Sequence, residues 1–329
     1  MEERMLNEIT LKAYAKINLS LVVTGRREDG YHDIRSLMQG IGLYDVIKIT
    51  KCLENGTKYN LSDCTIGGID VYLCTDVETI PTDMSNLALR GIAAVLDVMN
   101  RGGRSVAEVS GGLTVTIDKK LPVAAGIAGG SGNAAACMLG MNALLGYPLS
   151  LRELMEAGAR VGADVPFSLM MNARCNDGTL AGLRGLDEAS TAAWTGGIGD
   201  IVEPAEPLNY HVVMANPGIS VSTKAAYEAI DTIIAGSEEQ RSIDSHPLFI
   251  NDLESYTLRD YPDAARLKHV MESMLGADIV MMSGSGPTMI AYYKDADKAG
   301  TGFALMSRIC ENEPGWRTWL TVTGTEVLQ

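Results

Sequence analysis

The chain has little positive charge and few of the residues that bind metals or form cross-links. It holds 27 Lys and Arg against 41 Asp and Glu, a formal net charge of −14 over 329 residues. Nucleic acids and anionic membranes require a basic surface, so this balance argues against both as partners. The four histidines form no HxxxH or HExxH pattern. The six cysteines are scattered without a CxxC pair or metal-ligand spacing, so we expect reduced thiols.

Long apolar runs are also missing. No stretch approaches the roughly 18 residues that a membrane helix requires. The N-terminal segment MEERMLNEITLKAYAK carries early acidic residues and no apolar centre, so we expect neither a signal peptide nor a transit peptide. With 46% hydrophobic and 21% charged residues, the composition is typical of a globular protein with a substantial core, and the length favours two domains. We therefore expect a soluble cytoplasmic protein, whose oligomeric state the sequence leaves open.

Strand-like and helix-like patterns mix irregularly, which favours an α+β fold. Apolar alternation predicts strands at 11–23, 41–50, 113–117, 210–215, 278–282, 289–293 and 316–322. Helical spacing follows Asn86 and the glycine-rich segment, and recurs at 150–161, 222–234 and 262–275. Ser150 and Glu153 form the pattern of a capping box. Residues 24–36 read as a polar turn leading into a short helix or loop, and 176–199 as an irregular linker.

The most informative segment is KKLPVAAGIAGGSGN, residues 119–133, which precedes the small-residue run AAACMLGMNALLG. It predicts a strand end, a glycine-rich loop and a long helix. Glycines let the backbone approach a ligand, and amides at a helix N-terminus favour a bound anion. The segment has neither the GxxxxGK[ST] of the P-loop nor the GxGxxG of dinucleotide folds. A phosphate cradle is one interpretation, and a tight structural loop between sheet and helix is the other.

Four shorter motifs also bear residues capable of chemistry. AKINLSL places Lys16 and Asn18 on one face of a predicted strand, either as solvated residues or as a buried functional pair. GADVP sets Asp164 among apolar neighbours, as a cap residue or as a paired carboxylate. SGSGP, residues 283–287, is a second small-residue turn, and DGYH, residues 29–32, presents an aromatic ring and a histidine. Each motif alone has an ordinary structural explanation.

Taken in order, these motifs resemble the GHMP small-molecule kinases. The segments GRREDGYHDIRSL, GADVPF, NPGISVSTKAAYEA, NDLE and MSGSGP are similar to the branch that acts on cytidyl-linked methylerythritol in the non-mevalonate isoprenoid pathway. The resemblance runs from about Leu11 to Tyr293, and GRRxDGYH is its specific part because mevalonate and homoserine kinases lack it. It implies a two-domain fold, with a ribosomal-protein-S5-like N-terminal ATP-binding domain at 1–175 and a ferredoxin-like C-terminal substrate domain at 176–329.

The resemblance also implies a reaction and the residues that carry it. The γ-phosphoryl of ATP passes to the C2 hydroxyl of the methylerythritol moiety, with Mg²⁺ as cofactor. Asp164 corresponds to the carboxylate that orients or deprotonates this hydroxyl, and Lys16 to the lysine that keeps Asp164 ionised. Ser131 is expected near the phosphates or Mg²⁺. The positions assigned to ATP are Asn86, Leu87, Lys119, Pro122, Ala124, Gly126, Ala128, Gly129, Gly130, Ser131, Gly132 and Asn133.

The substrate side is expected to hold a cytidine diphosphate moiety. Tyr31 and His32 correspond to the cytosine site, Tyr227 to a second stacking ring, and Asn18 to a substrate contact. The positions assigned to the substrate are Asn18, Tyr31, His32, Tyr227, Ser283, Gly284, Ser285 and Gly286.

Three departures from the family pattern stand out: Gly132 replaces a serine, residues 182–195 form an insertion, and Asp200 replaces a glutamate. The insertion is expected to cover or reshape the mouth of the substrate site. Another GHMP kinase acting on a simple alcohol, and a ligand-binding regulator without turnover, are the alternatives. An RNA-binding S5-like protein is excluded by the charge.

Overall fold

The computed structural model describes residues 6–51, 63–109, 111–123, 125–234, 248–324 and 327. The chain folds into two compact units that are interleaved in sequence. Unit 1 comprises residues 1–15, 43–121 and 129–191, and unit 2 comprises residues 16–42, 122–128 and 192–329. Two long strands, β1 (Glu8–Arg26) and β2 (His32–Lys51), contribute residues to both units. The boundary expected at residue 175 stays a prediction.

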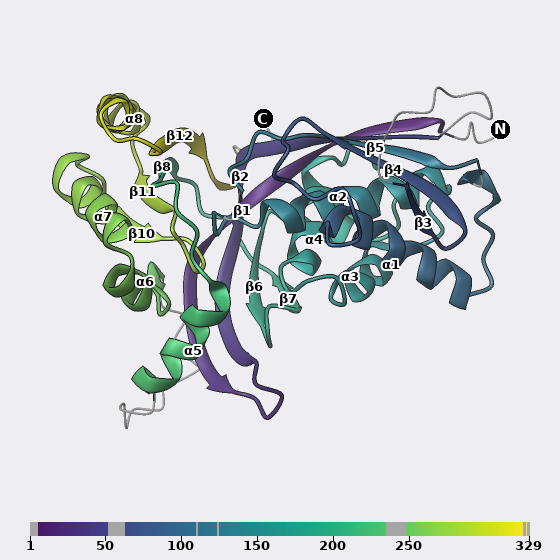
Figure 1. Cartoon of the computed structure of the whole chain (residues 1–329), viewed down its shortest axis with the longest axis horizontal. Coiled ribbons are helices and arrows are strands. Elements are labelled where there is room, and N and C mark those ends of the chain that lie inside the picture. Colours follow the sequence, from purple (N-terminus) through teal and green to yellow (C-terminus); the bar gives the residue numbers. More distant parts are fainter. Residues whose placement is uncertain are drawn as a thin grey trace. The chain divides into compact units, whose positions relative to one another are not determined.

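Unit 1 joins a sheet to four helices. Strand β4 (Ile69–Thr75) pairs antiparallel with β3 (Asp63–Ile66) and parallel with β5 (Leu113–Asp118), and β5 pairs antiparallel with β2. The helices are α1 (Leu87–Arg101), α2 (Gly129–Leu144), α3 (Leu151–Gly158) and α4 (Val165–Cys175), with short 3₁₀ turns at Ala107–Val109 and Leu186–Glu188. Figure 1 shows these helices gathered on one side of the strands.

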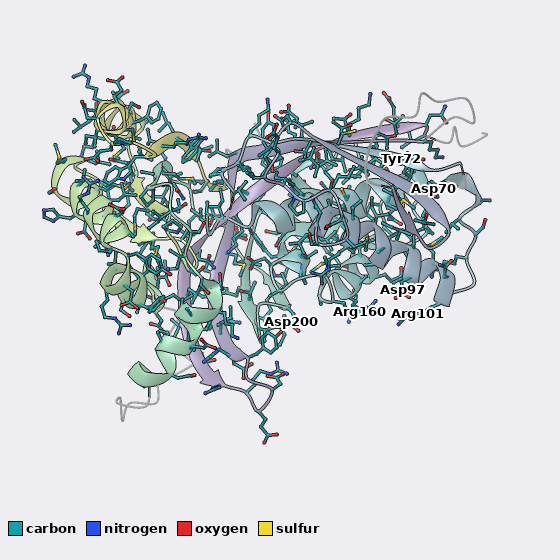
Figure 2. All side chains as sticks on the ribbon, viewed as in Figure 1. Asp70, Tyr72, Asp97, Arg101, Arg160 and Asp200 are labelled. Carbon is teal, nitrogen blue, oxygen red and sulfur yellow. The ribbon has the colours of Figure 1, made fainter. Side chains whose placement is uncertain are left out.

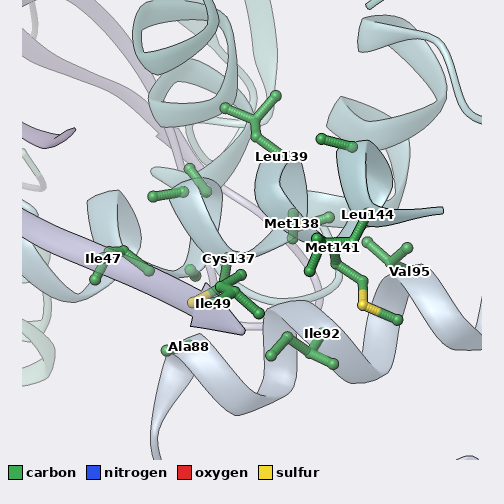
Figure 3. Close-up of a cluster of buried hydrophobic side chains, with 14 of the residues drawn as sticks. Ile47, Ile49, Ala88, Ile92, Val95, Cys137, Met138, Leu139, Met141 and Leu144 are labelled. Carbon is green, nitrogen blue, oxygen red and sulfur yellow. The ribbon is translucent and has the colours of Figure 1, made fainter. Parts of the chain in front are cut away.

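The core of unit 1 lies where α1 and α2 meet the sheet. Ile92 and Val95 of α1 and Met138 and Met141 of α2 are buried, and Figure 3 shows them together with Ile47 and Ile49 of β2. Burying such side chains stabilises the fold by about 1.5–3 kcal/mol each. On the exposed side of α1, Asp97 and Arg101 form a 2.9 Å ion pair (Figure 2).

Unit 2 is built on a four-stranded antiparallel sheet of order β10–β11–β8–β12. Its strands are β8 (His211–Asn216), β10 (Ile279–Met282), β11 (Met289–Tyr293) and β12 (Arg317–Val322), and α7 (Pro262–Met274) and α8 (Ala296–Glu311) pack against them. Helices α5 (Thr223–Ile234) and α6 (Glu254–Asp260) precede α7. Strands β6 (Ala192–Gly196), β7 (Ile201–Pro204) and β9 (Ile250–Asn251) complete the unit.

The α+β fold class and all seven predicted strands are confirmed, although β1 and β2 are longer than expected. The expected helices are present, and Ser150 caps α3 in a capping box with Glu153. Two expectations are wrong. Residues 32–36 belong to β2 rather than to a helix or loop, because Ser36 pairs with Thr195 of β6. That pairing also makes residues 192–196 a strand inside the segment expected to be an irregular linker.

Candidate active site

Two glycine turns of unit 2 meet through their backbones. Gly126 has φ +75°, and a Cβ at this position would lie 2.5 Å from the carbonyl oxygen of Ser283 and 2.9 Å from that of Gly286. The Ser283 hydroxyl donates a hydrogen bond of 3.1 Å to the Gly126 carbonyl. Only glycine tolerates both this conformation and this close approach. The two motifs that the sequence presented separately are therefore one piece of structure.

Polar side chains that the sequence analysis did not assign to the site hold the SGSGP turn in place. The side-chain amide of Asn251 donates to the carbonyls of Met282 and Gly284 at 2.9 and 2.8 Å. The Thr257 hydroxyl donates to the carbonyl of Ser285 at 3.2 Å. Asn251 lies in the NDLE segment that carries part of the family resemblance, so a signal for it was present.

Lys16 and Asn18 share one face of β1, as predicted. The Lys16 ammonium donates to Asn18 Oδ1 at 2.8 Å, and the Asn18 amide donates to Ser36 Oγ at 2.8 Å. Lys16 is only 4% exposed, and its backbone amide donates to the Ile127 carbonyl of the glycine-rich segment at 3.1 Å. The solvated-residue interpretation is therefore wrong. Ser36 was missed because its segment was not expected to be a strand.

His32 and Tyr227 come together, whereas Tyr31 points to solvent. The rings of His32 and Tyr227 stack with centroids 5.3 Å apart at an interplanar angle of 23°. His32 Nε2 also lies 2.7 Å from Asp231 Oδ1, and Arg26 pairs with the other oxygen of that carboxylate at 2.9 Å. Tyr31 is 62% exposed.

In unit 1, α2 begins at Gly129, so residues 129–133 form its first turns rather than a loop. The amides of a first helical turn have no partner within the helix and favour an anion. Asn133 is 5% exposed, and its Oδ1 has no hydrogen-bond partner among the residues that the structure describes. A Cβ on Gly132 would lie 2.7 Å from the carbonyl oxygen of Tyr14, which explains why a serine does not fit here. This helix end suits a phosphate group.

Lys119 and Asn86 are both held by neighbours within unit 1. The Lys119 ammonium pairs with Asp45 Oδ2 at 2.5 Å, and a Cβ on Gly129 would lie 3.2 Å from that ammonium. Asn86 caps α1, because its Oδ1 accepts from the Ala88 amide at 2.9 Å. Leu87 lies beside Gly130 in the first turn of α2, because a Cβ added to Gly130 would be 3.4 Å from Leu87 Cδ1. Of the remaining predicted ATP positions, Pro122 and Ala128 belong to unit 2 and Ala124 lies outside the described residues.

Asp164 occupies the N-cap position of α4, yet its carboxylate makes no capping hydrogen bond. The interpretation as a cap residue is therefore confirmed for its position, although the side chain does not contribute to the cap. The N-terminus of a helix favours a negative charge nearby, so an acidic residue is well placed here.

The first part of the expected insertion packs on α3 in unit 1. Arg184 donates to the Pro148 carbonyl at 3.0 Å and pairs with Glu153 at 3.2 Å, and Leu183 is buried. A role at the substrate mouth stays a prediction.

Two absences concern only the residues that the structure describes. Among them, no group of three His, Cys, Asp or Glu side chains is placed to hold a metal ion. None of the described helices has the length and apolar character to cross a membrane.

The fold and the glycine-rich helix start define the class. The family model for the GHMP kinases N terminal domain matches residues 86–172. A crystal structure of 4-(cytidine 5'-diphospho)-2C-methyl-D-erythritol kinase aligns with a TM-score of 0.65 at 24% identity, covering 96% of this chain and 99% of that one. The chain thus has the fold of the GHMP kinases.

Curated relatives define the particular family. The 4-diphosphocytidyl-2-C-methyl-D-erythritol kinase of Alkaliphilus metalliredigens is 34% identical over 92% of this chain and 94% of its own. The enzyme of the same name from Caldicellulosiruptor saccharolyticus is 36% identical over 92% of this chain and 97% of its own. The chain belongs to the 4-diphosphocytidyl-2-C-methyl-D-erythritol kinase family.

Proposed function

We propose that the chain transfers the γ-phosphoryl group of ATP to the 2-hydroxyl of 4-diphosphocytidyl-2-C-methyl-D-erythritol, in isoprenoid precursor biosynthesis by the non-mevalonate route. The observation that carries this proposal is the nearly full-length similarity to kinases of that name. Two arrangements support the proposal. Buried hydrogen bonds join Lys16, Asn18 and Ser36, and the rings of His32 and Tyr227 stack on each other. A cytoplasmic location with reduced thiols stays a prediction.

In phosphoryl transfer the protein mainly positions the reacting groups and stabilises the negative charge of the transition state. In the proposed mechanism, the Asp164 carboxylate orients the acceptor hydroxyl and takes its proton as the new P–O bond forms and the bond to ADP breaks. The Lys16 ammonium stabilises the negative charge on the transferring group. Asn18 fixes the direction of that ammonium by accepting its 2.8 Å hydrogen bond.

The helix start at Gly129–Asn133 is assigned to the phosphate tail of ATP. The backbone amides at this helix start are donors that fit an anionic ligand. A Mg²⁺ ion commonly binds through phosphate oxygens with only one or two protein groups, which agrees with the donor set here. The Ser131 hydroxyl is the protein group assigned to it, and the ion would neutralise phosphate charge when bound.

On the substrate side, Tyr31, His32 and Tyr227 are assigned to the cytosine ring. Aromatic stacking contributes on the order of 1–3 kcal/mol per base. Hydrogen bonds to the base edge supply selectivity, because an unmatched buried donor or acceptor is costly.

The test is phosphorylation of three acceptors by the full chain: the cytidyl-linked substrate, mevalonate and homoserine. We expect product only from the first, with a new phosphomonoester signal in ³¹P NMR. Phosphorylation of mevalonate or homoserine at an equal rate would favour the alternative of a simple-alcohol kinase. Binding of the cytidyl-linked substrate without any product would favour a silent regulator.

A further inference from the structure

The carboxylate of Asp231, on α5, contacts the side chains of both His32 and Arg26. Its Oδ1 lies 2.7 Å from His32 Nε2, and its Oδ2 lies 2.9 Å from an Arg26 nitrogen. The His32 side chain is 5% exposed and that of Asp231 is 24% exposed. Neither the family resemblance nor the substrate assignment includes Asp231.

This geometry determines where the imidazole carries its proton. An ionised carboxylate only accepts hydrogen bonds, so the nitrogen facing it must be the donor. Arg26 occupies the other oxygen, which leaves Oδ1 directed at His32. In the neutral ring, a proton on Nε2 leaves a lone pair on Nδ1. The stack against Tyr227 restrains the plane of the ring, so this lone pair has a defined direction.

We propose that Asp231 is a positioning residue that holds His32 in the Nε2–H tautomer and thereby makes the base site prefer cytosine to uracil. The inference rests on the proposed assignment of His32 to the base. Cytosine presents an exocyclic amino group, a donor that pairs with the Nδ1 lone pair. Uracil presents a carbonyl oxygen at the same place, so that two acceptors face each other.

Replacing Asp231 with asparagine tests the tautomer while keeping the side-chain shape. An asparagine amide donates as well as accepts, so the His32 proton is free to move to Nδ1, where it suits uracil. Glu228→Gln is the matched control. Glu228 lies one turn earlier on α5, its pair with Lys224 is a long 3.8 Å, and its loss changes the net charge equally.

The first measurement is the ratio of the dissociation constants of UDP and CDP, obtained by titration calorimetry on the full chain. We expect CDP to bind more tightly to the unsubstituted protein, Asp231→Asn to reduce the ratio about tenfold, and Glu228→Gln to preserve it. Asp231→Glu, which retains an acceptor, should recover most of the preference. An unchanged ratio in Asp231→Asn, or no preference in the unsubstituted protein, would overturn the inference.

The second measurement is made on the unsubstituted protein and uses a variant only to assign the His32 signal. Long-range ¹H–¹⁵N NMR correlations of the four histidines, with His32 assigned through His32→Gln, report the protonated nitrogen directly. At alkaline pH we expect the proton on Nε2 of His32, and a proton on Nδ1 would overturn the inference. A protein with this tautomer and this CDP preference that fails to phosphorylate the cytidyl-linked substrate would contradict the proposed function and leave the inference standing.

Discussion

The carboxylate of Asp45 and the ammonium of Lys119 lie 2.5 Å apart, with side chains 0% and 6% exposed. Asp45 also accepts hydrogen bonds from the backbone amides of Lys120 and Leu121 at 2.7 and 2.8 Å. One buried side chain of β2 therefore fixes the backbone that leads into the glycine-rich segment. Sequence analysis did not identify Asp45, because a single aspartate within a strand pattern carries no motif.

Asp45→Asn is expected to destabilise the protein strongly. It leaves the Lys119 ammonium buried without its counter-charge, a change that typically costs about 3–5 kcal/mol. Asp118→Asn is the control, since its pair with Lys120 is at least half exposed on both sides and is expected to contribute below about 1 kcal/mol. Urea denaturation measures both free energies of unfolding. Equal losses of unfolding free energy in the two variants would show that the buried pair contributes no more to stability than the exposed pair.

Gly132→Ala is expected to lower stability even though alanine is the better helix former. The added Cβ would meet the Tyr14 carbonyl at 2.7 Å, and overpacking of this kind costs about 1–3 kcal/mol. In Gly130→Ala the new Cβ meets only Leu87 at 3.4 Å, so helix propensity is expected to raise stability by up to about 1 kcal/mol. Thermal unfolding of the two variants decides the matter, and a stabilised Gly132→Ala would contradict the close approach of α2 to β1.

The capping box of α3 is expected to weaken in acid. The Ser150 amide, which donates to Glu153 at 2.8 Å, and the nearby Arg104 guanidinium hold the pKa of Glu153 below its ordinary value. A carboxyl whose pKa is lower in the folded state stabilises the protein above its unfolded-state pKa, and this contribution is lost as the pH falls through the folded-state pKa. Glu153→Gln should therefore cost about 0.5–1 kcal/mol at neutral pH and progressively less below about pH 4. A difference that stays constant down to about pH 3 would show that the charge has no part in it.

Two thiols are expected to resist alkylation in the folded protein. Burial raises the pKa of Cys137 to about 12 and that of Cys175 to about 12, and the thiolate is the reactive form. Mass spectrometry after iodoacetamide treatment at neutral pH should find both unmodified in the native protein and modified after denaturation. Rapid labelling of Cys137 in the native state would contradict its place between α2 and the sheet.

Periodicity predicted the elements whose apolar faces are regular. β11 and α7 begin where expected, because alternation and helical spacing there match the buried faces. Residues 32–36 were misassigned because polar residues break the apolar alternation there, although Ser36 is buried and pairs with Thr195 of β6. The hairpin of β3 and β4 was missed although Gly67 and Gly68 mark its turn.

The motifs predicted how residues close in sequence are arranged better than they predicted contacts between residues far apart in the chain. Strand geometry places Lys16 and Asn18 on one face, and the structure adds the hydrogen bond between them. The contact between His32 and Asp231 joins residues 199 positions apart, and no periodicity encodes it. No periodicity encodes the hydrogen bond from Asn251 to the Gly284 carbonyl of the SGSGP turn either.

The central claim is that Asp164 carries out the proton transfer of a kinase reaction. The direct measurement is ADP release, coupled to NADH oxidation, with ATP, Mg²⁺ and the cytidyl-linked substrate. Asp177→Ala, near the other end of α4 and in an exposed pair with Arg174, is the matched control and should retain the rate of the unsubstituted protein. Asp164→Ala is expected to lower the rate by about 10²–10⁴-fold, and an Asp164→Ala protein as active as the control would contradict the account.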